Sequence, residues 1–333
     1  MAGLSHRKPV HSASAPRTRG GARERRPAVR RMPSGRAAPS VQQLIATTAR
    51  RLARARLYYG HGTENARDDA LALVMHAMRL GPIATARCLH RQAPAAARAR
   101  LAALLQRRVR EHVPVVYLTQ RCWFAGLPLY VDERVLIPRS PIAELIERRF
   151  VPWVRPGQVR RLLDIGTGSG CIAIACARAF PRARVDATDI SSAALAVARI
   201  NVLRHRLSER VRLYQADLFA GMRPARYDII VSNPPYVRER ELQGLPPEYR
   251  HEPRLALAAG RDGLDAVRGI LREAAAHLTE AGILIVEVGD SESALRRAFP
   301  QLPFLWLAFE RGGGGVFLLS RTQLLASSPQ RTR

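Results

Sequence analysis

Apolar residues change their spacing along this chain, and the change separates a helical part from a part where strands and helices alternate. Over residues 41–117 they recur at every third or fourth position, which places them on one face of a helix. The clearest series are Leu71, Val74, Met75 and Met78, and then Leu101, Leu104, Leu105 and Val109. We therefore predict a small helical domain over residues 40–118, and we assign its stripes to the core.

From about residue 160 onward, short apolar runs alternate with helical stretches. The predicted strands are 161–165, 183–189, 211–215, 227–232, 282–288, 303–309 and 315–319; the predicted helices are 169–179, 191–206, 265–279 and 291–299. Such alternation is typical of a mostly parallel sheet with helices on both faces. The last two runs leave no room for a crossover helix between them, so they should pair antiparallel. We predict an α/β catalytic domain over residues 150–322 with a seven-stranded, mostly parallel sheet whose last strand is antiparallel.

The segment between the two domains, residues 119–149, reads as a β-hairpin and a linker. Residues 122–136 favour two short strands around Gly126-Leu127-Pro128. A helix-like stretch follows at residues 142–148. The hairpin should join the helical domain to the catalytic one.

The two ends of the chain have little apolar surface to offset the entropy lost on ordering, so we predict disordered tails at residues 1–39 and 323–333. The first tail is rich in Arg and holds Glu24 as its only acid. A solvated tail is the interpretation we favour; an organellar transit peptide has a similar composition. The location we expect is cytoplasmic, with an organelle as the alternative if the tail is a transit peptide.

Composition narrows the class of partner. The formal net charge is +27, almost entirely from Arg, since Lys8 is the only lysine. Such a charge favours non-specific proximity to RNA, although a bias in codon usage would produce it as well. No apolar run approaches the roughly 18 residues that span a membrane, and the four cysteines have neither metal-ligand nor disulfide spacing. We expect no membrane and no metal.

A glycine-rich turn follows the first strand of the alternating part. Asp164 and Ile165 lead into Gly166, Thr167, Gly168, Ser169 and Gly170, and a helix follows. Glycines let a ligand approach bare backbone, and the start of a helix offers free N–H groups. The Gly-x-Gly-x-Gly spacing leaves less room for a pyrophosphate than the dinucleotide form does, and it better suits the methionine part of S-adenosylmethionine. A purely structural turn is the alternative.

Two acids stand at the ends of the next two strands. Asp189 is placed to accept hydrogen bonds from ribose hydroxyls. Asp217 could accept a hydrogen bond from an adenine amine, and the apolar Leu218 next to it could cover the adenine ring. Alternatively, Asp217 simply caps a turn. The carboxyl ends of parallel strands are where open α/β sheets bind ligands. We predict a cofactor site there.

The sequence Asn233-Pro234-Pro235-Tyr236 ends the fourth strand of the same rim. Two prolines hold the backbone in one shape and lack N–H groups, so their carbonyls and the Asn carboxamide can point at a ligand. The Tyr ring could form one wall of a flat slot. Such a slot suits a planar amide or an aromatic amine whose nitrogen is to be alkylated, whereas a proline-rich turn is the structural alternative.

Together, the segment 164–170 and the motif 233–236 resemble those of class I S-adenosylmethionine-dependent methyltransferases that modify amide or amine nitrogens. More narrowly, residues 41–322 resemble the protein glutamine methyltransferases, which act on release factors or on ribosomal protein L-three. Residues 130–146, residues 245–253 and the ending 312–317 are similar to the ribosomal-protein branch. Gly166 and Gly314 depart from that branch, which leaves release factors as the alternative substrate.

The resemblance implies a Rossmann-like fold, S-adenosyl-L-methionine as the cofactor and roles for particular residues. The implied cofactor-binding residues are Asp164, Gly166, Thr167, Gly168, Ser169, Gly170, Asp189, Asp217, Leu218 and Asn233. The implied substrate-binding residues are Asn233, Pro234, Pro235 and Tyr236, of which Asn233, Pro234 and Tyr236 are also catalytic. The Asn233 carboxamide oxygen and the Pro234 carbonyl would accept the two N–H groups of a glutamine amide, and Tyr236 would pack against its plane. No dedicated base is needed.

Two other functions fit part of the pattern. Adenine and cytosine amino-methyltransferases of DNA or RNA share the Pro-Pro-Tyr slot, but they flip a base out and carry a target-recognition region. Here the extra domain is short, helical and N-terminal. A non-catalytic RNA-binding chaperone would use the basic tail alone, and it would have no need of the cofactor segments.

Overall fold

The computed structural model describes residues 38–81, 88–222 and 224–326. Its helices are α1 (Val41–Ala53), α2 (Ala66–Ala77), α4 (Ala95–Arg110), α5 (Val115–Thr119), α6 (Ile142–Glu147), α7 (Cys171–Ala179), α8 (Ser192–Arg204), α9 (Asp265–His277), α10 (Glu292–Ala298) and α11 (Arg321–Ala326). Its strands are β1 (Cys122–Phe124), β2 (Leu127–Leu129), β3 (Arg161–Ile165), β4 (Arg184–Asp189), β5 (Val211–Gln215), β6 (Tyr227–Ser232), β7 (Leu278–Glu287), β8 (Leu305–Trp306) and β9 (Val316–Ser320). Most of the predicted 1–39 tail and part of the 323–333 tail lie outside the described residues.

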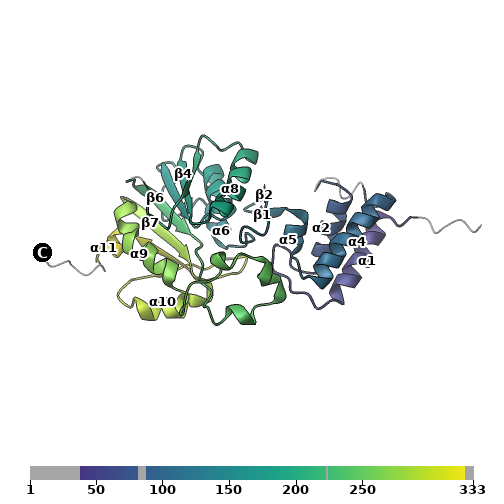
Figure 1. The fold of residues 1–333 in the computed structure, drawn as a ribbon. Coiled ribbons are helices and arrows are strands. Elements are labelled where there is room, and N and C mark those ends of the chain that lie inside the picture. Colours follow the sequence, from purple (N-terminus) through teal and green to yellow (C-terminus); the bar gives the residue numbers. More distant parts are fainter. Residues whose placement is uncertain (1–37, 82–87, 223, 327–333) are drawn as a thin grey trace, which may run out of the picture. The chain divides into compact units, whose positions relative to one another are not determined.

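Seven strands form one sheet in the order β5-β4-β3-β6-β7-β9-β8 (Figure 1). The pairs from β5 to β7 are parallel, whereas β9 runs antiparallel to both β7 and β8. The predicted fold class is therefore confirmed. The predicted strand 303–309 is shorter than expected, and β7 starts at Leu278, where the predicted helix 265–279 should still continue.

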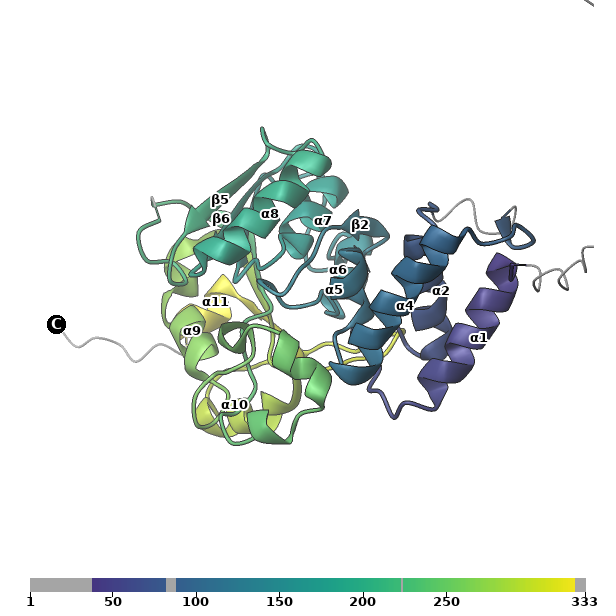
Figure 2. The ribbon, with the colours of Figure 1, turned by 45° about the vertical axis from the view of Figure 1, so that its right-hand side comes forward.

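Alternate residues of the strands pack on opposite faces of the sheet. Leu162 and Ile285 lie in a core with α6 and α7, whereas Leu163 and Leu284 lie in a second core with α9, α10 and α11. Figure 2 shows α9 and α11 beside each other. Because both faces are covered, the carboxyl ends of the strands form the accessible rim for a ligand.

The helical domain is built from α1, α2, α4 and α5, which Figure 1 draws in purple and blue. Ser40 begins it with a capping box, in which its hydroxyl accepts from Gln43 N and the Gln43 side chain accepts from Ser40 N. Of the predicted stripe, Val74 is fully buried, but Leu71 is 38% exposed, because the buried face is centred on Leu73 and Val74. The core of this domain also includes Val197 of α8, so the two domains share apolar contacts.

Three boundaries differ from the sequence prediction. The hairpin is shorter than expected: the turn is at Ala125 and Gly126, both of which have positive φ, and residues 130–136 are irregular. At the C-terminal end, α11 runs to Ala326 with Leu324 buried, although a tail was expected from residue 323. At the other end, Pro39 accepts a hydrogen bond from Ala93 N, so it is part of the folded chain. Among the described residues no helix is long and apolar enough to cross a membrane.

Candidate active site

A cavity of about 510 Å³ opens at the carboxyl ends of β3, β4, β5 and β6. It brings together most of the predicted site residues: Gly166, Thr167, Gly168, Ser169, Asp189, Asp217, Leu218, Asn233, Pro234 and Pro235. Three predicted residues, Asp164, Gly170 and Tyr236, do not line it. Two further segments form its outer wall, the linker at 134–140 and the segment at 253–259.

Asp164 lies beneath the glycine-rich turn. It is 1% exposed, and its Oδ2 accepts from Thr167 Oγ1 at 2.6 Å and from Ala173 N at 3.1 Å. Burial raises the pKa of this carboxyl to about 7, although both hydrogen bonds lower it. Its other oxygen has no partner among the described residues. Asp164 therefore braces the turn from below.

The three glycines of the turn have different surroundings, although all have positive φ. A Cβ on Gly166 or Gly168 would meet nothing within 4 Å, so both present bare backbone to open space in the cavity. A Cβ on Gly170 would lie 3.3 Å from the Cβ of Ala198 in α8. The first two glycines admit a ligand, and the third allows close helix packing.

Asp189 ties the turn to the next strand. Its Oδ2 accepts from Gly168 N at 2.8 Å, and its Oδ1 accepts from Ser191 N at 2.9 Å. Burial raises its pKa, and these two backbone hydrogen bonds oppose the shift. Each carboxylate oxygen keeps a lone pair for a further donor such as a hydroxyl.

Leu218 and Ile190 contribute apolar surface to the cavity. Leu218 has a φ of 54° and packs against α9, where a Cβ on Gly269 would lie 2.3 Å from its Cδ1. Ile190, which is 50% exposed, lines the same cavity. The sequence prediction included Leu218 but missed Ile190 and Gly269, because neither belongs to a recognisable motif.

Asn233 lines the cavity and has an acceptor without a partner in the described part of the chain. Its side-chain Oδ1 is buried and has no hydrogen-bond partner among the residues that the structure describes. Pro234 and Pro235 line the cavity beside it. A buried polar atom without a partner costs free energy unless a ligand satisfies it.

Tyr236 is not among the residues that line the cavity. Its hydroxyl donates to Glu287 Oε1 at 3.1 Å, and its ring lies so close to Gly289 that a Cβ there would be 2.7 Å from Cε2. Burial raises the pKa of the phenol. The phenol therefore anchors the motif to the end of β7. The predicted role of the ring as a wall of the slot stays a prediction.

Glu287, which the sequence prediction missed, connects the motif to the linker. It ends β7, is 4% exposed, and accepts from Ser140 Oγ at 2.5 Å as well as from Tyr236. Burial raises its pKa to about 7, against the effect of both hydrogen bonds. An acid at the carboxyl end of a central strand was the signal that could have identified it.

Asn201 of α8 joins the other side of the linker to the glycine-rich turn. It exchanges two hydrogen bonds with the backbone of Tyr130, at 2.7 and 2.8 Å, and also donates to Ser169 O at 2.9 Å. The linker is therefore held at Tyr130 and at Ser140, on either side of its cavity-lining part. Among the described residues no cluster of His, Cys, Asp or Glu could hold a metal ion.

Comparison with known proteins agrees with this site. The family model for the methyltransferase small domain matches residues 149–245, and the model for the PrmC N-terminal domain matches residues 43–119. The catalytic part is thus a methyltransferase.

The curated relatives define the class more narrowly. The chain is 46% identical over 286 residues to the ribosomal protein uL3 glutamine methyltransferase of Bordetella pertussis, covering 86% of this chain and 96% of that one. It is 45% identical over 287 residues to the protein of the same name from Neisseria meningitidis serogroup B, covering 86% and 94%. The chain belongs to the ribosomal protein uL3 glutamine methyltransferase family, which confirms the resemblance drawn from its motifs.

Proposed function

We propose that this protein transfers a methyl group from S-adenosylmethionine to the side-chain nitrogen of a glutamine in ribosomal protein uL3. The unpartnered Oδ1 of Asn233 carries this proposal, because it is a buried acceptor that an amide N–H would satisfy. The names of the relatives support uL3 as the substrate.

The cavity residues fit the cofactor. Gly166 and Gly168 offer open backbone for its amino-acid part, and Asp189 retains lone pairs for the ribose hydroxyls. Leu218 and Ile190 provide apolar surface for the adenine, with Asp217 at the same end. When bound, S-adenosylmethionine supplies a methyl group activated by a sulfonium sulfur.

The protein's own contribution is to orient a poor nucleophile. The lone pair of an amide nitrogen is delocalised into its carbonyl, so attack needs a fixed geometry. Asn233 Oδ1 and the Pro234 carbonyl accept the two N–H groups and turn the nitrogen toward the methyl. Both contacts strengthen as positive charge develops on that nitrogen, which lowers the barrier more than it tightens substrate binding. Once the nitrogen is methylated its proton is acidic and passes to water.

The Asn233→Ala variant tests this role. We expect transfer to uL3 to fall by about a hundredfold or more, since one oriented acceptor is lost in the transition state. Cofactor affinity, measured by calorimetry, should change far less. Gln158→Ala, which removes an exposed amide, is the matched control and should retain full activity. Near-normal turnover in Asn233→Ala would contradict the mechanism.

The substrate is tested by incubating the enzyme and labelled cofactor separately with uL3, a release factor and a duplex DNA. We expect label on uL3, located on a glutamine by mass spectrometry. Label on the release factor alone would assign the sister activity. Label on DNA alone would exclude glutamine as the acceptor.

A further inference from the structure

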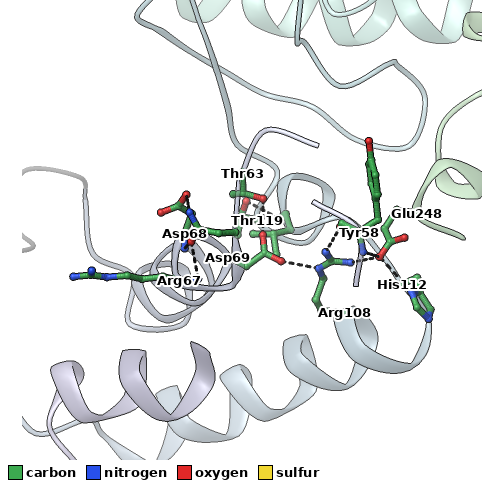
Figure 3. A network of polar contacts seen from close by, with 11 residues as sticks. Tyr58, Thr63, Arg67, Asp68, Asp69, Arg108, His112, Thr119 and Glu248 are labelled. Atoms are coloured by element: carbon green, nitrogen blue, oxygen red, sulfur yellow. Dashed lines mark hydrogen bonds and ion pairs between the residues drawn. The ribbon is translucent and has the colours of Figure 1, made fainter. Parts of the chain in front are cut away.

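A buried ion-pair network connects the helical domain to the segment that follows the Asn233 motif. Arg108 of α4 donates through Nε to Asp69 Oδ2 at 2.8 Å and through Nη1 to Glu248 Oε1 at 3.0 Å (Figure 3). Its Nη2 donates to Tyr58 O at 2.8 Å. Arg108 is 2% exposed, and Asp69 and Glu248 are fully buried.

The hydrogen bonds to the Glu248 carboxylate come from the helical domain and all reach Oε1, whereas Oε2 is buried without a partner among the described residues. Besides Arg108, its Oε1 accepts from Tyr58 N at 3.0 Å and from His112 Nδ1 at 3.2 Å, all more than 130 positions away in the sequence. Burial alone would raise its pKa, but these hydrogen bonds hold the pKa below its usual value. The carboxylate is therefore charged. Its ion pair and hydrogen bonds attach the segment 245–253 to the helical domain.

Such an anchor is costly. Removing three charged groups from water is expensive, and apolar residues of similar size often stabilise a fold as well or better. A buried ion pair can instead provide specificity, because it allows only one position for the groups that it joins. Glu248 thus fixes where its segment lies more strictly than apolar packing would.

The other end of the same segment forms the cavity wall. Glu252 is held by two hydrogen bonds from Arg139, one of them 2.7 Å from Nη2 to Oε2. Five of the residues 253–259 then line the cavity, all except Arg254 and Leu257. Val237, next to Tyr236, exchanges backbone hydrogen bonds at 2.9 Å with Leu257 and Ala259. A shift at Glu248 would move this wall and the end of the Asn233 motif together.

We propose that Glu248 is a positioning residue, through which the helical domain fixes the segment 245–259 against Asn233 and so sets the orientation of the glutamine amide. This inference rests on the proposed function. Glu248 touches neither the cavity nor the reacting atoms, and it acts through the residues that follow it.

The test compares Glu248→Gln with Asp69→Asn. Both replace a fully buried carboxylate by its isosteric amide, and both remove one charge partner of Arg108. The Asp69 carboxylate, however, accepts its hydrogen bonds from Thr63 and Arg108, which both belong to the helical domain. We expect both variants to melt at lower temperature. Only Glu248→Gln should lose kcat on uL3, by about tenfold to a hundredfold, because a displacement near 1 Å has that effect on aligned reactants.

Two readouts separate positioning from simple destabilisation. Assays below both melting temperatures should show unchanged cofactor affinity in each variant. Amide hydrogen exchange should rise over residues 253–259 in Glu248→Gln alone, and this measurement needs no methyl transfer. Equal kcat and equal exchange in the two variants would overturn the inference. If the wild type fails to methylate uL3, the proposed function is wrong. The hydrogen-exchange data still decide whether Glu248 positions residues 253–259.

A milder variant covers the case in which Glu248→Gln does not fold. His112→Gly removes one donor to Glu248 but leaves the Arg108 ion pair, and Gly adopts the positive φ of 57° at this position without strain. We expect a smaller fall in kcat with little change in melting temperature. Wild-type kcat and wild-type exchange in this variant would count against the proposal.

Discussion

Asn233 and Tyr236 belong to one four-residue motif, yet their polar atoms have opposite surroundings. The Oδ1 of Asn233 is buried without a partner, whereas the Tyr236 hydroxyl donates to Glu287. A buried acceptor without a partner beside a cavity is available to a ligand, and a satisfied hydroxyl is a structural anchor. In this motif Asn233 is thus the residue available to bind a ligand, and Tyr236 is the residue that holds the motif in place. Tyr236 is in turn connected through Glu287 to Ser140.

The shifted pKa of Glu287 predicts a pH dependence of stability. Burial raises this pKa from 4.5 to about 7, so the folded state keeps a proton that the unfolded chain releases. The stabilisation is complete below about pH 4.5 and is lost as the pH rises through about 7. In Glu287→Gln the free energy of unfolding should fall less steeply across this window, by about 1 kcal/mol per pH unit.

Chemical denaturation at several pH values measures this slope. Asp164 titrates in the same direction in both proteins, so only the difference between them reports on Glu287. Glu209→Gln, at an exposed position, should retain the wild-type slope. Identical slopes in Glu287→Gln and the wild type would show that this carboxyl is not perturbed.

At the scale of elements, the turn between β3 and α7 was predictable from local chemistry. A strand, a run of glycines and a helix indicate a tight turn with free N–H groups, and the structure has that arrangement. Which glycine faces a ligand and which faces a helix was not predictable. That distinction depends on α8, whose Ala198 lies against Gly170.

Two Ala substitutions should separate these roles. Both positions have positive φ, so each substitution should cost about 1–2 kcal/mol of stability from strain. Gly170→Ala should cost more, because its methyl group would crowd Ala198. Gly166→Ala should instead weaken cofactor binding, because its methyl group would project into the cavity. Denaturation and calorimetry measure the two effects, and the same ranking in both would contradict the assignment.

At the scale of the whole molecule, the net positive charge of the chain does not determine its fold. Residues 1–37 carry ten basic residues and one acid, about a third of the net charge of +27. Charge of this kind raises association with nucleic acid without specifying a fold. Any effect of the N-terminal segment should therefore appear in RNA affinity and not in catalysis.

Removing residues 1–37 tests this separation. We expect weaker binding to a non-specific RNA and a shallower dependence of affinity on salt, since fewer counterions are released. Methyl transfer to isolated uL3 should be unchanged. Binding at several salt concentrations provides the measurement, with the full chain as the control. A large loss of transfer would place the segment in substrate recognition.

The sequence by itself determined the kinds of elements, their order and the motifs at the strand ends, because periodicity, turn chemistry and strand-end residues are local properties. It placed Asn233, Asp189 and the glycine-rich turn on one rim, because parallel strands end on the same side. Only the tertiary structure decided that Tyr236 turns back to Glu287, and that Glu248 reaches Arg108 140 positions away. Those contacts depend on which distant segments meet, and a buried charge can be assigned a partner only once the surfaces that exclude water from it are in place.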